Sequence, residues 1–339
     1  MIDGHTAPSS PLWEEAAECG VCGSREWSLV GTICGRRYVA CRQCAVHRLY
    51  DRVAEHRLDL LYGGGYYPTT DPASAELEQQ FRNPTFSHRR ARLESCLARR
   101  ERRILELGCG DGNFLAVLRR HGWEVYGQEF SAEAAALVDR RHHISVFTGD
   151  LAGVAPPRPF PVVGAYHVLE HVYHPAAWVR RVRELVEPGG LLHLQVPNGA
   201  SLTRQLTGQT WAGFVFPQHV YFYTPETLGS FLERSGFSIL TATTWDPWHG
   251  PGTVSRSIYN LATRALTGRL PWKDTIDDRE QPRPAPPAAQ STARHPWRAV
   301  SRALLESASA RLARIEAIAG RGAVVDVIAR RAERVERNE

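Results

Sequence analysis

The feature that most constrains the fold is a regular alternation of short apolar segments with amphipathic ones between Arg103 and Trp245. The apolar segments have the length of buried strands, and the segments between them have helical spacing. Strands that alternate with helices in this way predict an α/β fold with a mostly parallel sheet and helices on both faces. The expected strands are ILELG (104–108), EVYGQEF (124–130), ISVFTGD (144–150), one within VVGAYHVLEHV (162–172), LLHLQVPN (191–198) and SILTATTW (238–245).

The alternation breaks after Trp245. Two stretches with helical spacing, about 253–267 and 297–318, flank a Pro/Ala-rich patch, QPRPAPPAAQ (281–290), whose composition predicts disorder. A last strand is then expected late in the chain, at GAVVDVIARRA (322–332). We interpret residues 247–320 as a helical insertion before the last strand, with helices that cover a pocket.

A glycine-rich turn follows the first expected strand, within Ile104–Phe114 (ILELGCGDGNF). In open parallel sheets, ligands bind beyond the C-terminal ends of the strands. Glycines at alternate positions allow a tight turn and a close approach of a ligand to the backbone. The helix that follows points its first N–H groups at that ligand. Taken alone, the turn fits any adenosine-containing cofactor, because dinucleotide dehydrogenases use a similar loop.

Acidic residues at the ends of successive strands narrow the choice of cofactor. Glu129 lies 21 residues beyond Gly108, where an acid can hydrogen-bond both hydroxyls of a ribose. Asp150 is placed to accept from an adenine amino group, with Leu151 packing against the ring. Glu106 favours a cationic amino acid moiety over a pyrophosphate, which it would repel. Together these positions predict S-adenosylmethionine (SAM) as the cofactor.

The series of motifs resembles that of class I SAM-dependent methyltransferases. It consists of ELGCGDG (106–112), the acid of YGQEFS (126–131), the Asp of TGDL (148–151), HVLEHV (167–172) and the EPGG turn (187–190). The resemblance implies a seven-stranded Rossmann-like sheet whose last strand runs antiparallel, which fits the late segment 322–332. The expected cofactor-binding residues are Tyr67, Glu106, Gly108, Cys109, Gly110, Glu129, Phe130, Asp150, Leu151, His167 and His171.

The segment from His167 to His171 also matches the H-x-x-E-H pattern of inverted zinc proteases. A metal site of that kind needs the whole segment on a helix and a further acidic ligand from another helix. Here an apolar strand runs directly into the motif, and His174-Pro175 interrupts it soon afterwards. We therefore expect Glu170 and His171 to brace the floor of the methyltransferase pocket.

Four of the seven cysteines form two C-x2-C pairs, Cys19 with Cys22 and Cys41 with Cys44, separated by 18 residues. Two pairs at this spacing predict a tetrahedral zinc site, which four thiolates close, so the zinc is expected to be structural. This part of the chain has little apolar bulk, and a metal would stabilise it. We call the segment with the paired cysteines the knuckle. The knuckle, a tyrosine-rich linker and the methyltransferase core together resemble a bacterial subgroup that includes sugar C-methyltransferases of antibiotic pathways.

These features divide the chain into three parts. Residues 1–60 are predicted to form a small zinc-ribbon-like knuckle domain with its lead-in, 61–100 a linker with an amphipathic helix, and 101–333 the SAM-binding domain. No apolar run approaches the roughly 20 residues needed to cross a bilayer. The N-terminus lacks the basic start and apolar core of a secretory signal. We therefore expect a cytoplasmic protein that does not bind a membrane.

The candidate catalytic residues lie after the fifth expected strand. Methyl transfer needs alignment, and a base where the nucleophile holds a proton. His219 can titrate near neutrality, and Tyr221 is placed to orient a hydroxyl substrate. The sugar C-methyltransferases have a Glu-His pair in the matching segment, whose His is regarded as the base, whereas this chain has Gln218 before His219. Whether His219 is a base or only packs the next helix is left open.

Three functions compete. The favoured one is methyl transfer to a carbon or oxygen of a small molecule, in specialised-metabolite or sugar biosynthesis. The second is RNA-directed methylation that uses the zinc knuckle, and the third is SAM binding without catalysis. The net charge of +5 does not favour nucleic acid, because the basic residues are spread along the chain rather than clustered with aromatic residues. The Asn/Asp-Pro-Pro-aromatic signature of base N-methylation is also missing after the fourth expected strand.

Overall fold

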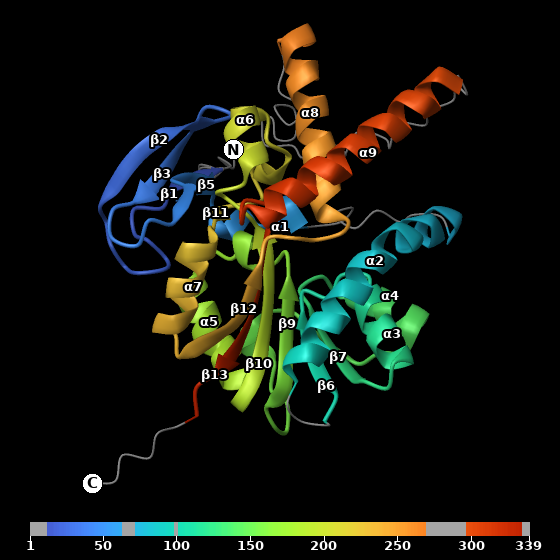
Figure 1. The fold of residues 1–339 in the computed structure, drawn as a ribbon. Coiled ribbons are helices and arrows are strands. Elements are labelled where there is room, and N and C mark those ends of the chain that lie inside the picture. Colours follow the sequence, from blue (N-terminus) through green and yellow to red (C-terminus); the bar gives the residue numbers. More distant parts are fainter. Residues whose placement is uncertain (1–11, 63–71, 98–100, 269–295, 334–339) are drawn as a thin grey trace, which may run out of the picture.

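A mixed seven-stranded sheet forms the centre of the molecule, in the order β12-β13-β10-β9-β6-β7-β8 (Figure 1). The computed structural model describes residues 12–62, 72–97, 101–268 and 296–333. The strands of the sheet are β6 (Arg103–Leu107), β7 (Glu124–Glu129), β8 (Val146–Thr148), β9 (Phe160–Tyr166), β10 (Val186–Pro197), β12 (Phe237–Thr243) and β13 (Val324–Arg331). The strands from β6 to β10 pair in parallel, and β13 runs antiparallel to both of its neighbours. The predicted seven-stranded sheet and its reversed last strand are confirmed.

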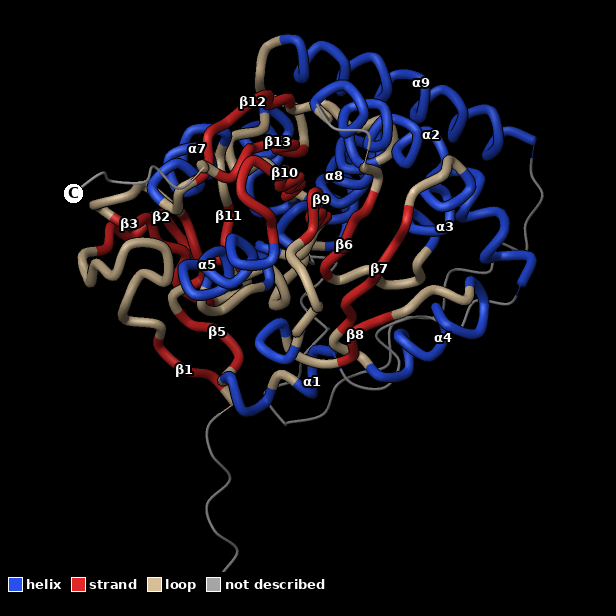
Figure 2. The backbone as a smooth tube through the Cα atoms, turned by 90° about the horizontal axis from the view of Figure 1, so that it is seen from below, coloured by secondary structure: helices blue, strands red, loops and turns tan. Residues whose placement is uncertain are grey.

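Helices cover both faces of this sheet. Figure 2 shows α2, α3 and α4 on one face and α5 and α7 on the other. These helices are α2 (Pro72–Cys96), α3 (Asn113–Arg120), α4 (Ala132–His142), α5 (Pro175–Leu185) and α7 (Pro225–Arg234). Each face has its own apolar core, so Phe114 of α3 packs with Ile104, whereas Val179 of α5 packs with Leu105. Neighbouring residues of β6 thus face opposite cores, and all five residues of the strand are buried.

One predicted boundary was wrong. The sequence predicts a turn at EPGG (187–190), but α5 ends at Leu185 and β10 begins at once with Val186. The EPGG segment lies inside the strand, where the register with β9 shifts between Val186 and Leu191. Gly189 has a φ of 75°, a conformation that glycine adopts at no steric cost, so the irregular segment fits between two paired stretches.

The insertion before the last strand contains α8 (His249–Thr267) and α9 (Pro296–Ile318), which match the two expected helices. They pack against each other, and α8 also packs against α6 (Leu202–Thr207). Figure 1 shows both helices above the upper end of the sheet, at the side where β9 and β10 end. The Pro/Ala-rich patch 281–290 lies outside the described residues.

The N-terminal region consists of two small sheets. In the first, β1 (Trp13–Glu15) pairs with β5 (Asp51–Val53). The second has the order β11-β4-β3-β2 and is formed by β2 (Trp27–Ile33), β3 (Arg36–Cys41), β4 (His47–Leu49) and β11 (Tyr221–Phe222). Strand β11 belongs to the predicted SAM-binding domain, so the knuckle region shares a sheet with that domain. No helix in the parts of the chain that the structure describes is long and apolar enough to cross a membrane.

Candidate active site

The glycine turn between β6 and α3 requires its glycines. Gly108, Gly110 and Gly112 have φ angles of 62°, 55° and 71°, in the left-handed region where a side chain is strained. A Cβ atom on Gly108 would stand 2.6 Å from a methyl carbon of Val168. The turn therefore carries no side chain at these three positions, and a ligand can approach its backbone closely.

A cavity of about 240 Å³ opens beside this turn, and we call it the turn cavity. The predicted cofactor-binding residues on its wall are Gly108, Glu129, Phe130, Asp150, Leu151, His167 and His171. Residues that the sequence did not point to complete the wall, among them Leu58, Tyr62, Gln128, Val168 and Trp178. Predicted residues from the ends of several strands thus meet in one cavity.

Glu129 is held in place by the backbone. Its Oε2 accepts from the N–H of Gly110 at 2.9 Å and its Oε1 from the N–H of Ser131 at 3.0 Å. The residue is only 3% exposed. Because each carboxylate oxygen accepts more than one hydrogen bond, both oxygens can still accept from a pair of hydroxyls. Gly110 itself is not on the cavity wall, but its N–H holds the carboxylate of Glu129 in place.

Gln128 connects the glycine turn with the loop before Asp150, a role that the sequence analysis missed. Its Oε1 accepts from the N–H of Gly108 at 3.2 Å, and its Nε2 donates to the carbonyl of Gly149 at 2.7 Å. The signal available in the sequence was a glutamine directly before Glu129, at the end of an expected strand. Asp150 accepts from the N–H of Ala152 at 3.3 Å, which orients its carboxylate at the cavity rim.

Glu106, Cys109 and Gly110, which were also predicted to bind the cofactor, are not on the cavity wall. Glu106 is buried behind the turn, and its Oε2 has no hydrogen-bond partner within the described structure. Burial raises the pKa of Glu106 to about 8, although Arg89 acts in the opposite direction. Cys109 is buried too, and its N–H donates to the carbonyl of Gln128 at 3.0 Å. Tyr67 lies outside the described residues, but Tyr62 from the same segment places its hydroxyl 3.1 Å from His171 Nδ1.

The HVLEHV segment is a turn at the end of β9 rather than an α-helix. His167 has a φ of 59°, and Leu169–His171 form one turn of 3-10 helix. Glu170 is fully buried, with its Oε1 3.2 Å from Nδ1 of His167 and 4.0 Å from Nε2 of His219. Burial opposes ionisation, but the hydrogen bond from His167 and the three neighbouring histidines lower the pKa of Glu170 to about 2. This carboxylate, which we expected to brace the pocket floor, is thus charged and faces histidines.

A second cavity, of about 1130 Å³, lies on the other side of His167 and His171, which line both cavities. We call it the histidine cavity, because His219 and His249 also lie on its wall. Thr253 and Tyr259 of α8 and Leu305 of α9 cover it. The insertion therefore covers a pocket, as the sequence predicts.

His219 lies on this wall with one nitrogen already bonded. Its Nδ1 is 2.8 Å from the carbonyl oxygen of Gly213, which can only accept, so Nδ1 carries the hydrogen. Burial and the neighbouring His171 lower the pKa of His219 to about 3. The ring is therefore neutral at pH 7, and Nε2 presents a lone pair. Gln218 also lines the cavity, but the carboxylate nearest to His219 comes from Glu170.

Tyr221 points elsewhere. It is 1% exposed, and its hydroxyl accepts from the N–H of Gly20 at 3.1 Å and from Nη1 of Arg48 at 3.0 Å. Gly20 lies between the two cysteines of the first C-x2-C pair. The contacts of Tyr221 join the segment after His219 to the knuckle, and Tyr221 is not on the wall of the histidine cavity, contrary to its expected contact with a substrate.

The four paired cysteines form one cluster, with one Sγ atom from each within 4.8 Å of the others. The Sγ atoms of Cys19 and Cys44 are 3.7 Å apart, and those of Cys22 and Cys41 are 3.6 Å apart. Four thiolates about 2.3 Å from a zinc ion stand about 3.8 Å apart, whereas a disulfide measures about 2.05 Å. The arrangement fits a closed tetrahedral shell and not a pair of disulfides.

Comparisons with known proteins show which family the chain belongs to. A family model described as a methyltransferase domain matches residues 78–242. Two ubiquinone biosynthesis O-methyltransferases from strains of Cereibacter sphaeroides are 30% identical over 185 residues and 28% identical over 180, and each alignment covers 49% of this chain and 70% of the relative. A solved SAM-dependent methyltransferase from Archaeoglobus fulgidus is 20% identical with a TM-score of 0.44, over 77% of this chain and all of the other. The chain belongs to the class I family of SAM-dependent methyltransferases and is an enzyme of that family.

Proposed function

We propose that this methyltransferase acts on an oxygen or carbon atom of a small molecule held in the histidine cavity. The observation that carries the proposal is Nε2 of His219, 4.0 Å from the buried carboxylate of Glu170, on the wall of a cavity that adjoins the turn cavity. The relatives named as O-methyltransferases support oxygen. The resemblance to sugar C-methyltransferases supports carbon, and a role in specialised-metabolite or sugar biosynthesis.

The residues of the turn cavity are proposed to hold SAM. When bound, SAM supplies a sulfonium methyl group that an in-line nucleophile can displace. Glu129 would accept from the ribose hydroxyls and Asp150 from the adenine amino group, with Leu151 and Phe130 against the ring. Glu106 is proposed to stabilise the cationic amino acid end from behind the glycine turn.

His219 is proposed to take the proton of the acceptor. Its Nδ1–H is donated to the carbonyl of Gly213 at 2.8 Å, so only Nε2 can receive a proton. The imidazolium that forms would be stabilised by the ionised carboxylate of Glu170. Gln218 stands where the sugar C-methyltransferases have a glutamate, so the charge beside His219 comes instead from Glu170, which acts to raise the pKa of the ring although burial outweighs it.

Replacing His219 by asparagine is expected to lower turnover at least about tenfold, the low end of what a general base contributes. SAM affinity should stay the same, because His219 does not line the turn cavity. Transfer of a labelled methyl group to a panel of phenols and sugars measures turnover, and calorimetry measures SAM binding. His174→Asn, at an exposed histidine, is the matched control. Unchanged turnover would remove the base assignment, and a wild-type chain that binds SAM without any transfer would support the non-catalytic alternative.

SAM binding is expected to release a proton from Glu106. The pKa of this buried carboxyl, about 8, keeps it protonated at pH 7 in the free protein, and a nearby cation favours the ionised form. Affinity should therefore rise with pH up to about 8 and then level off. Calorimetry at pH 7 in buffers of different ionisation heat counts the protons, and Glu106→Gln, which cannot ionise, is the comparison. Equal proton counts in the two proteins would contradict the proposal.

We also propose that Cys19, Cys22, Cys41 and Cys44 hold a structural zinc ion. Their spacing in the sequence and their Sγ separations of 3.6 and 3.7 Å support this. Four thiolates leave no open coordination position, so the metal would stabilise the knuckle and take no part in methyl transfer.

A further inference from the structure

A second histidine of the histidine cavity has the same bonding pattern as His219, although no sequence motif points to it. His249 begins α8, and its Nδ1 lies 3.1 Å from Oδ1 of Asp246. Asp246 is fully buried, and its pKa is lowered, because donors around it outweigh the effect of burial. An ionised carboxylate only accepts hydrogen bonds, so Nδ1 of His249 carries the hydrogen. The lone pair of the neutral ring is therefore on Nε2.

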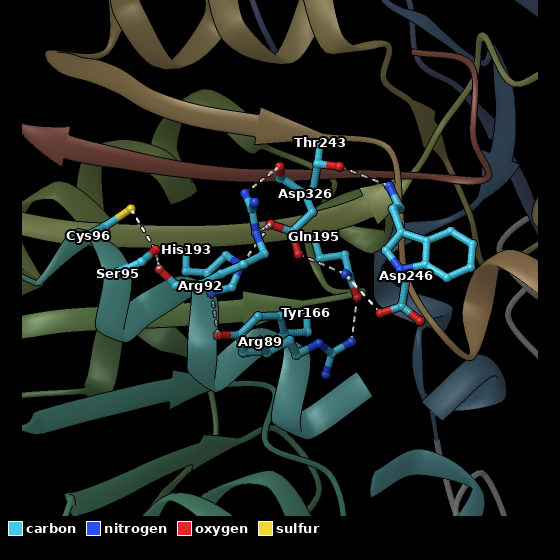
Figure 3. A network of polar contacts seen from close by, with 11 residues as sticks. Arg89, Arg92, Ser95, Cys96, Tyr166, His193, Gln195, Thr243, Asp246 and Asp326 are labelled. Carbon is cyan, nitrogen blue, oxygen red and sulfur yellow. Dashed lines mark hydrogen bonds and ion pairs between the residues drawn. The ribbon is translucent and has the colours of Figure 1, made fainter. Parts of the chain in front are cut away.

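The carboxylate of Asp246 accepts more hydrogen bonds than a helix N-cap requires. Its Oδ1 accepts from the N–H groups of Trp248 at 2.9 Å and His249 at 2.6 Å, as a cap would, and also from the hydroxyl of Thr85 at 2.8 Å. Its Oδ2 accepts from Nε2 of Gln195 at 3.2 Å, a residue of the buried network in Figure 3. Groups from α2 and β10 thus fix the carboxylate to which the ring of His249 is bonded.

The ring of His249 stands where the two cavities meet. It stacks on His167, with centroids 4.1 Å apart and planes 33° apart, and His167 lines both cavities. On the same wall, His219 lies edge-on to His171 at a centroid distance of 4.6 Å. His167 and His171 both belong to the HVLEHV turn. His219 and His249 therefore each pack against a histidine of that turn and line one cavity.

Both rings are neutral at pH 7. Burial and His167 lower the pKa of His249 to about 4, while Asp246 acts in the opposite direction and Arg89 adds to the lowering. Each ring has its Nδ1–H bonded to the protein, His219 to a carbonyl and His249 to a carboxylate. The cavity therefore offers two hydrogen-bond acceptors of the same kind, and a ligand that satisfies both must carry two donors.

We propose that Nε2 of His249 accepts a hydrogen bond from a second hydroxyl or amine of the acceptor, beside the group that His219 deprotonates. The acceptor would be a small molecule with two adjacent donors, such as a catechol or a vicinal diol. This inference rests on the proposed role of His219. His249 gains no proton in the reaction, so it determines which acceptor binds, and Asp246 is a positioning residue that acts through it.

The test compares catechol with phenol, which differ by one hydroxyl, on the full chain saturated with S-adenosylhomocysteine. In spectra of the ¹⁵N-histidine-labelled protein, catechol should shift the Nε2 resonances of both His219 and His249, and phenol only that of His219. Catechol should bind at least about threefold more tightly than phenol, as one added hydrogen bond allows.

Two variants distinguish the effect of the hydrogen bond from the effect of the ring's shape on the preference for catechol. His249→Phe keeps a flat ring beside His167 but has no nitrogen, so the preference for catechol should vanish. His249→Gln can donate its amide N–H to Asp246 and present its carbonyl oxygen to the cavity, so the preference should be retained. Thermal unfolding of both variants checks that they fold.

The outcomes distinguish the two proposals. A preference for catechol that survives in His249→Phe, or an Nε2 resonance of His249 that catechol leaves unchanged, would overturn the role of His249 and leave that of His219 intact. If neither probe shifts His219 while catechol shifts His249, the assignment of the base fails instead.

Discussion

A chain with Cys41 replaced by serine is expected to lose its zinc and nearly all of its methyl transfer, while its affinity for SAM falls much less. Cys41 is 2% exposed, and its Sγ is 3.6 Å from that of Cys22, so serine would leave an incomplete shell. Structural zinc contributes about 10–16 kcal/mol of apparent binding energy in small zinc domains, so its loss is expected to unfold the knuckle.

We expect the loss of zinc to disturb the histidine cavity because β11 joins the knuckle region to the segment around His219. This strand pairs with β4 of the knuckle region, with Tyr221 opposite Arg48, and the N–H of Leu49 donates to the carbonyl of Val220 at 3.0 Å. Val220 directly follows His219. When the knuckle unfolds, the segment that carries His219, the proposed base, loses its partners in β4, whereas the glycine turn keeps its hydrogen bonds to Gln128.

Zinc content by atomic absorption, SAM binding by calorimetry and transfer of a labelled methyl group measure this effect. Cys34→Ser is the matched control, because Cys34 lies in the same region but outside the cluster. If the control loses zinc as well, or if Cys41→Ser keeps it, the four-cysteine site is wrong. If the zinc is lost but turnover is unchanged, the link through β11 is wrong.

Replacing Glu129 by alanine is expected to weaken SAM binding at least about thirtyfold. Hydrogen bonds to a charged group contribute about 1.5–3 kcal/mol each, and about 2 kcal/mol corresponds to a factor of about 30. The alanine would also leave the N–H groups of Gly110 and Ser131 without their carboxylate acceptor. Affinity is measured by calorimetry at pH 7.

Two further variants define the role of Glu129. Glu133→Ala removes a nearby exposed carboxylate that accepts from the hydroxyl of Ser131 at 2.8 Å, and it should bind SAM normally. Glu129→Gln keeps an oxygen for the backbone but loses the charge, so its affinity should lie between the other two. An affinity of Glu129→Ala within about threefold of wild type would exclude a ribose contact.

The sheet and the turn cavity were predictable because their signals are local. A strand buried on both sides is apolar along its length, as in β9, and the glycines of the turn directly follow β6 in the sequence. Parallel strands bring their carboxyl ends to one edge, so Glu129 and Asp150 were expected near each other, and both lie on the wall of the turn cavity. The number of strands and the reversed last strand then followed from the family resemblance.

The histidine cavity could not be predicted in the same way, because it depends on contacts between distant segments. Glu170 reaches His219 from a turn 49 residues earlier in the chain, and Asp246 is fixed by Thr85, 161 residues away. Tyr221 looked like a substrate contact because it stands two positions after His219. Its orientation depends on Arg48, which no local pattern connects to it.

The shared sheet has a consequence for how such a chain can be cut or recombined. A fragment starting at residue 61 would keep β11 but lose β4, and a fragment ending at residue 60 would expose the edge of β4 to other chains. Grafting the knuckle onto another methyltransferase should therefore fail unless residues 219–223 are transferred with it. The knuckle region is thus not an independent module, and the two parts are expected to have diversified together.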